Sequence, residues 1–138
     1  MPALSVEVGG DVFATGRLGP DSSAAGTNIA GVGWWNGESE GNWLLAWVTH
    51  ALLLQDETAI AAVRAYLGRI VDCQGDDGYI GMFTEAARAQ RPYVGGDLWT
   101  QSRVLQALQV WVGYTGDEAI SAAISAALDY SANRFRLA

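Results

Sequence analysis

The sequence predicts an all-α protein built from two antiparallel helical hairpins, which follow an irregular N-terminal leader. The first observation is a series of four helical patterns after residue 40. The second is a weak internal repeat, in which each unit is a buried helix, a tight Asp-Glu turn and an amphipathic helix. The two units align Leu44 with Leu105, Asp56 with Asp117, and Ile60 with Ile120. A single hairpin of this kind cannot bury its own apolar faces, so repetition is expected, and about six such units would close a toroid.

Residues 1–33 form the predicted leader, and residues 34–138 form the predicted helical domain. The leader is rich in glycine and carries only short apolar pieces, so we expect it to be extended or irregular, or to include a short strand. The first helix is expected over about residues 40–54. Its side chains are apolar nearly all round, and a helix without a polar face is buried on most sides. We therefore expect its two tryptophans to belong to the core and His50 to be a satisfied core or inter-helix residue.

Three further helices complete the two hairpins. The second, about residues 58–73, is amphipathic, with apolar side chains at helical spacing on one face. The third, about residues 98–113, is again rich in bulky apolar residues and includes Trp111, which we also assign to the core. The fourth, about residues 118–134, consists mostly of Ala and Ser outside one apolar face. We expect that face to consist of Ile120, Ile124, Ala127, Leu128 and Ser131.

The charge and the composition argue against several classes of function. The chain has 138 residues, enough for one domain with a sizeable core, and a net charge of −7 in which every basic residue is arginine. An acidic chain without a basic stripe argues against a nucleic acid or an anionic membrane as partner. One cysteine and one histidine argue against a protein-built zinc site, and we expect no cofactor. No apolar run is long enough to span a membrane and no signal peptide is visible, so we expect a cytoplasmic protein.

The order of the helices brings polar and aromatic loop residues to one end of the molecule. The first and third helices run in the same direction, so the two Asp-Glu turns lie together at their C-terminal ends. The opposite rim collects the segment before the first helix, the segment between the second and third helices, and the end of the chain. Aromatic faces and carboxylates are what a sugar-binding rim needs, for stacking and for accepting hydroxyl protons. The candidate substrate-binding residues are Trp34, Trp35, Asp77, Tyr79 and Trp99, and the candidate catalytic carboxylates are Glu38 and Asp97.

Each candidate also has a plainer interpretation. Glu38 and Glu40 are first-turn acids of the kind that a helix N-terminus favours, and two residues apart they do not face the same way. Asp77 and Tyr79 also fit a turn in which Gly78 has a positive φ and the tyrosine packs inside. The tryptophans at the loop–helix junctions either stack on a ligand or pack with one edge exposed.

Three motifs resemble the N-terminal part of the β-L-arabinofuranosidase family, glycoside hydrolase family 127, in the wider class of six-hairpin glycosidases. The first is Trp-x-x-Glu-x-x-Gly-x-x-Leu at Trp35, Glu38, Gly41 and Leu44. The second is Gln-x-x-Asp-Gly-Tyr-x-Gly at Gln74, Asp77, Gly78, Tyr79 and Gly81, and the third is Thr115-Gly116-Asp117. The resemblance covers roughly residues 34–135. It implies a segment of an (α/α)6 toroid, of which this chain supplies two hairpins.

The resemblance also bears on activity. It implies a sugar-binding ancestry, whereas the family's cysteine nucleophile, its zinc and its glutamate acid/base lie in the second half of the barrel and have no counterpart here. A substrate-contacting histidine of the family corresponds to Gly96-Asp97 in this sequence.

We therefore expect a carbohydrate-active protein, a glycoside-hydrolase-like segment with a sugar-binding rim and without complete catalytic machinery. One alternative is an independent enzyme in which Glu38 or Asp97 acts as acid or base. Another is a helical oligomerisation or interaction module without a small-molecule site. Two hairpins leave apolar flanks that a full toroid would cover, so we expect a homo-oligomer or a fragment of a longer chain.

Overall fold

The computed structural model confirms an all-α fold and describes Phe13, residues 34–90 and residues 96–135, except for the side chains of residues 34–36 and 90. The predicted irregular leader therefore lies, apart from Phe13, outside the described residues. The helices are α2 (Trp34–Leu54), α3 (Glu57–Asp72), α4 (Glu85–Gln90), α5 (Asp97–Thr115) and α6 (Glu118–Arg134).

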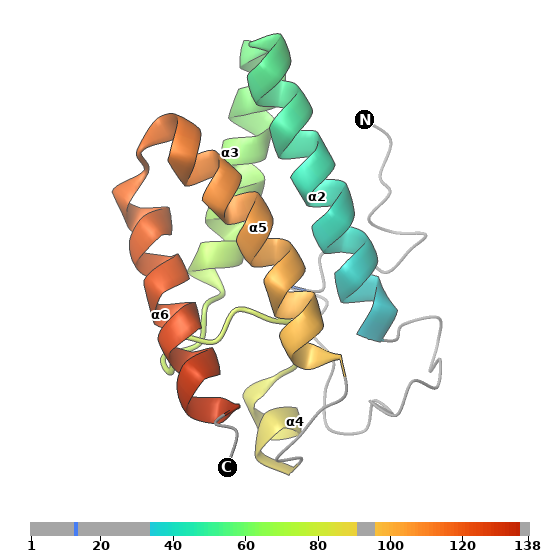
Figure 1. Cartoon of the computed structure of the whole chain (residues 1–138), viewed down its shortest axis with the longest axis vertical. Coiled ribbons are helices and arrows are strands. Elements are labelled where there is room, and N and C mark those ends of the chain that lie inside the picture. Colours follow the sequence, from blue (N-terminus) through green and yellow to red (C-terminus); the bar gives the residue numbers. More distant parts are fainter. Residues whose placement is uncertain (1–12, 14–33, 91–95, 136–138) are drawn as a thin grey trace.

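Two helical hairpins make up most of the described structure (Figure 1). One consists of α2 and α3, and the other of α5 and α6. The first helices of the two hairpins, α2 and α5, lie side by side, run in the same direction and share the most extensive contact between any two helices. Consequently the N-terminal ends of α2 and α5, the C-terminal ends of α3 and α6, and the short helix α4 all lie at one end of the molecule (Figure 1).

Each hairpin turns at an aspartate that caps the following helix. The Asp56 carboxylate accepts hydrogen bonds from the backbone N–H groups of Thr58 and Ala59 at 3.0 and 3.1 Å, and α3 begins directly after it. The Asp117 carboxylate accepts the N–H of Ile120 at 3.2 Å at the start of α6. These bonds satisfy donors that have no partner within the helix, which explains why the two Asp-Glu turns recur at matching positions.

A single apolar core lies between the helices, and it holds Trp111 of α5, which is fully buried. The other two tryptophans that we assigned to the core, Trp43 and Trp47, are only partly buried and pack against it. The close approach of α2 to α5 depends on Gly41. A Cβ added there would lie 2.5 Å from the Cβ of Arg103, so the α5 backbone occupies the space that a side chain would need.

Several details differ from the sequence-based expectation. The first helix begins at Trp34 rather than near residue 40, because its glycine-containing first turns pack against α5. Its predicted burial on most sides is wrong at its C-terminal end, where Leu53 and Leu54 are 76% and 74% exposed. The prediction that His50 is a core or inter-helix residue is also wrong. His50 is exposed, and its Nδ1 lies 2.7 Å from the carbonyl oxygen of Ala46.

Two further differences concern the second hairpin. Leu128 was assigned to the apolar face of α6, but half of its surface is exposed, since no helix of the described part of the chain covers that flank. The short helix α4 was not expected, since six residues are too few to show a helical period. No helix among the described residues combines the length and the apolar character that crossing a membrane requires.

Candidate functional site

The segment between α3 and α4 folds into a tight turn that presents Asp77. Gly78 has a φ of 89°, and its N–H donates to the carbonyl oxygen of Gly75 at 2.8 Å. One Asp77 carboxylate oxygen accepts the N–H of Tyr79 at 3.2 Å, which closes the turn locally. The side-chain amide of Gln74 donates to Gly78 and to Ala123 of α6, at 2.8 and 2.9 Å. The turn is therefore fixed against the last helix rather than left as a free loop.

Tyr79 points inward and joins this turn to α5. Its hydroxyl donates to the carboxylate of Asp97 at 2.8 Å and accepts the backbone N–H of Phe83 at 3.1 Å. Tyr79 is completely buried, and Asp97 is 3% exposed. Burial, together with the negative charge of Asp97, raises the pKa of Tyr79 well above its ordinary 10.0, so the phenol stays protonated and remains a donor.

Burial also shifts the pKa of the Asp97 carboxyl. It raises the pKa of this carboxyl above the ordinary 3.8, although the hydrogen bond from Tyr79 and the charges of Arg88 and Arg134 oppose the rise. Asp97 is the first residue of α5, where the helix dipole favours a negative charge. Its side chain is nevertheless used inside the protein, as an acceptor for Tyr79.

Arg88 of α4 connects the turn to α6. Its Nη1 donates to the second carboxylate oxygen of Asp77 at 2.6 Å and to the hydroxyl of Tyr130 at 3.0 Å. Its guanidinium carbon lies 4.0 Å from the centre of the Tyr79 ring and 5.2 Å from that of Tyr130, within the range of cation–π contact. Arg88 is 7% exposed, and Arg134 donates to its carbonyl oxygen at 2.9 Å. The guanidinium thus holds a carboxylate and a phenol together at the edge of the core.

Arg88 also sets the charge of Asp77. Burial works to raise the pKa of Asp77, but hydrogen bonds from Arg88 and from the N–H of Tyr79, with the charge of Arg88, lower it below 3.8. In turn, Asp77 and Tyr130 raise the pKa of Arg88 above its ordinary value against the effect of its burial. Asp77 is therefore ionised at neutral pH and acts as a hydrogen-bond acceptor.

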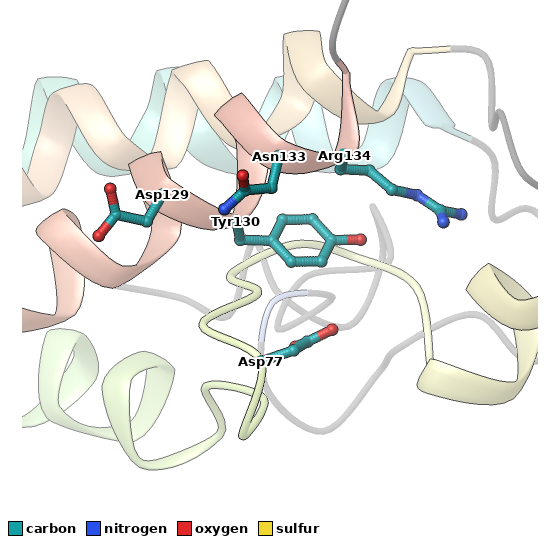
Figure 2. A pocket seen from close by; sticks show the side chains of 5 residues that line it. All are labelled: Asp77, Asp129, Tyr130, Asn133 and Arg134. Carbon is teal, nitrogen blue, oxygen red and sulfur yellow. The ribbon is translucent and has the colours of Figure 1, made fainter.

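An open depression of about 370 Å³ lies beside this network. It is lined by Asp77 from the turn and by Asp129, Tyr130, Asn133 and Arg134 from the end of α6. Figure 2 shows Asp77 facing the α6 residues, with the Tyr130 ring between them. The residues that line the depression therefore carry two carboxylates, an amide, a guanidinium and a phenol.

The structure brings three of the predicted site residues together, namely Asp77, Tyr79 and Asp97, which belong to one network through Arg88 and Tyr79. Only Asp77 reaches the surface depression. Tyr79 is buried, as the turn interpretation of its motif expects, and does not offer a face to a ligand.

The remaining predicted site residues lie elsewhere on the same end of the molecule or outside the description. Glu38 is half-buried in the second turn of α2, and it lines none of the described pockets. Trp99 is 48% exposed on α5, and the guanidinium of Arg103 stacks over its ring at 4.2 Å. Trp34 and Trp35 begin α2, but their side chains lie outside the described residues.

Sequence reasoning missed Arg88 and the α6 residues that line the depression. A usable signal existed for the second group. The direction of the helices placed the end of the chain on this rim, and the fourth helix ends with polar and aromatic residues in an otherwise Ala- and Ser-rich segment. Arg88 gave no such signal, because its role depends on two tyrosines that are 9 and 42 residues away in sequence.

Comparison with known proteins gives no relative: no family model matches the chain, and neither does any curated protein or solved structure. Among the described residues, no group of three or more acidic, histidine or cysteine side chains is arranged to hold a metal ion.

The two aspartates of the network predict opposite dependences of stability on pH. Because its folded-state pKa is raised, Asp97 contributes stability below about 3.8 that is lost as the pH rises through the folded value. Asp77 has a lowered pKa, so its contribution is present above 3.8 and is lost as the pH falls through the folded value. Relative to the wild type, we expect Asp97→Asn to have a higher free energy of unfolding at pH 7 than at pH 3.5. We expect the opposite change for Asp77→Asn. Urea unfolding between pH 3 and 7 measures both effects. If the free energy of unfolding changed with pH by the same amount in the two variants, the opposite pKa shifts of Asp97 and Asp77 would be contradicted.

Proposed function

We propose that this chain is a carbohydrate-binding helical protein, a glycoside-hydrolase-like segment with a sugar-binding rim and without complete catalytic machinery. The observation that carries the proposal is the depression formed by Asp77 and the end of α6. The resemblance of the Trp35, Gln74 and Thr115 motifs to the β-L-arabinofuranosidase family supports it. A place in an (α/α)6 toroid and a cytoplasmic location stay predictions within this proposal.

The chemistry of the depression suits a neutral sugar. A sugar ring presents several hydroxyl groups, each of which donates and accepts hydrogen bonds, together with apolar C–H faces. Asp77 and Asp129 supply acceptors, Arg134 supplies donors, and Asn133 supplies both. Tyr130 supplies an aromatic surface and a phenol. Carboxylates of Asp77 and Asp129 on either side of the site disfavour an anionic ligand.

The same geometry does not favour an enzyme. Glycoside hydrolysis needs one carboxylic acid to protonate the leaving group and one carboxylate on the other side of the bond. Asp77 is kept ionised by Arg88, and Asp97 is buried against Tyr79, so neither is placed as a general acid at the surface. We therefore assign no catalytic role to Asp97 or Glu38.

Isothermal titration calorimetry against a panel of neutral pentoses, hexoses and their oligomers tests the proposal. We expect binding without turnover of aryl glycosides, and Tyr130→Ala is expected to weaken it about tenfold through the loss of about 1.4 kcal/mol of aromatic and hydrogen-bond contact. Leu98→Ala is the control, because this exposed side chain lies outside the depression and should leave binding unchanged. Turnover that disappears in Glu38→Gln or Asp97→Asn would instead establish an independent enzyme.

A homo-oligomer is the second candidate, and a specific flank favours it. The groove between α5 and α6 is lined by three leucines and by uncharged polar residues, and two of the leucines, Leu98 and Leu128, are about half exposed. Its lining consists of Leu98, Gln101, Ser102, Leu105, Gln106, Gln109, Leu128 and Ser131. Two copies of a chain with net charge −7 meet with least repulsion at an uncharged surface. Amides both donate and accept, so they can pair with their own copies across a two-fold axis.

We expect a dimer through this groove, which a full toroid would cover with its next hairpin. Analytical ultracentrifugation of the wild type should show a dimer at high concentration, and Leu98→Glu with Leu128→Glu should show a monomer. Both leucines are about half exposed, so the substitutions leave the core intact. A monomeric wild type across the accessible concentration range would contradict this candidate.

A further inference from the structure

A second apolar groove lies at the opposite end of the molecule, between the C-terminal halves of α2 and α5. It has a volume of about 270 Å³ and is lined by Thr49, Leu52, Leu53, Val110, Gly113 and Tyr114. Leu53 is 76% exposed and Tyr114 is 58% exposed, and Leu54 beside them is 74% exposed. Such a concentration of large apolar side chains at one place on a small acidic protein indicates a binding surface.

Carboxylates outnumber arginines around this groove. Asp56 and Glu57 follow α2, and Asp117 and Glu118 follow α5. Four carboxylates therefore lie where the chain turns next to the groove. Among the described residues, Arg64 is the one arginine near this end, and it is already stacked over the ring of Trp111 at 5.6 Å.

The other described arginines belong to the opposite end of the molecule. They lie in the last turn of α3, in α4, in the second turn of α5 and at the end of α6, as Arg69, Arg88, Arg103 and Arg134. The groove thus lies at an end whose described charges are four carboxylates and Arg64, whereas the other described arginines and the proposed sugar site lie at the opposite end, together with further carboxylates such as Asp76, Glu85 and Asp129.

We propose that the α2–α5 groove binds a basic amphipathic helix of a partner protein. The leucines and Tyr114 fit the apolar face of such a helix, which presents side chains at positions i, i+3, i+4 and i+7. The carboxylates of the two turns fit lysine or arginine residues on its flanks. An added strand is not an option at this site, because its walls are helices and offer no unpaired strand edge. A second copy of this chain fits poorly, since its corresponding end carries the same negative charge.

The inference does not depend on sugar binding, and a designed peptide tests it with the full chain. The probe is a fluorescent amidated peptide of about 14 residues, made of Leu, Ala and Lys with leucines at helical spacing. A control peptide has Glu in place of each Lys. Fluorescence anisotropy should show binding of the Lys peptide, at least about tenfold weaker binding of the Glu peptide, and a loss of affinity as salt is added.

Variants place the binding at the groove. Leu53→Ala with Leu54→Ala should weaken binding about tenfold without unfolding the protein, because both side chains are exposed. Glu57→Gln with Glu118→Gln should weaken it severalfold and reduce its salt dependence. The helix-capping Asp56 and Asp117 are left unchanged. Leu98→Ala with Leu128→Ala, on the α5–α6 groove, is the matched control and should have no effect.

Three results would overturn the proposal. The first is equal binding of the Lys and Glu peptides, and the second is unchanged binding to the Leu53 and Leu54 variant. The third is no binding to the full chain, which would mean that the groove is closed by another copy or by other residues of this chain. Ultracentrifugation of the Leu53 and Leu54 variant shows whether another copy closes the groove, because a dimer that uses this groove would dissociate in the variant.

Discussion

Tyr79→Phe is expected to destabilise the protein by about 3 kcal/mol. The deleted hydroxyl donates to Asp97 at 2.8 Å and accepts the N–H of Phe83 at 3.1 Å. Asp97 and Phe83 are both almost completely buried, so water cannot replace the lost partner. A buried carboxylate without its donor costs more than a neutral group, because its desolvation is no longer compensated.

Two measurements distinguish this cause from a general packing defect. The pKa of Asp97, followed by NMR of its carboxyl carbon, should rise further in Tyr79→Phe, because the hydrogen bond from Tyr79 lowers it in the wild type. Adding Asp97→Asn should recover part of the lost stability, since a neutral amide carries no buried charge. Tyr130→Phe is the control: Arg88 keeps its bond to Asp77, so the loss should stay below about 1 kcal/mol. A Tyr79→Phe protein as stable as the wild type would show that this network does not support the fold.

Gly41→Ala is expected to reduce the free energy of unfolding by about 2 kcal/mol through overpacking. The new Cβ would lie 2.5 Å from the Cβ of Arg103 and 3.1 Å from backbone atoms of α5, so the two helices would have to separate. This penalty outweighs the gain of up to about 1 kcal/mol that alanine normally brings to a helix.

Gly68→Ala supplies the matched comparison. It also replaces a glycine within a helix, but no atom lies within 4 Å of the added Cβ. Here only the helix propensity changes, and we expect stabilisation by up to about 1 kcal/mol. Urea denaturation of both variants gives the sign of each change. Stabilisation by both alanines would contradict the close contact of α2 and α5 on which the arrangement of the rim depends.

The sequence predicted the helices well where their patterns were long. The four main helices, their Asp-Glu turns and the common direction of α2 and α5 follow from periodicity, capping residues and the repeat. The start of α2 was placed too late, because a glycine such as Gly37 disfavours a helix until its contact with Thr100 of α5 is known. The sequence analysis expected two hairpins to leave uncovered apolar flanks, but it did not identify Leu53, Leu54 and Leu128 as the residues that would be exposed.

The site was predictable only in part. The directional argument placed Asp77, Tyr79 and Asp97 at one end, where the structure connects them through hydrogen bonds and the Arg88 guanidinium. That argument could not predict where the side chains point, because their directions depend on one buried phenol and on one arginine between two tyrosines. Periodicity reports which residues share a face, but it does not report which polar groups meet across different elements.

An NMR titration is the sharpest test of the proposal that the depression beside Tyr130 binds a neutral sugar. Isotope-labelled protein is titrated with the sugar of highest affinity in the calorimetric panel, and backbone amide shifts are followed. We expect saturable shifts concentrated at Asp77 and at residues 129–134, with little change at Leu53 and Tyr114. Shifts confined to the α2–α5 groove, or no shift with any sugar of the panel at millimolar concentration, would contradict it.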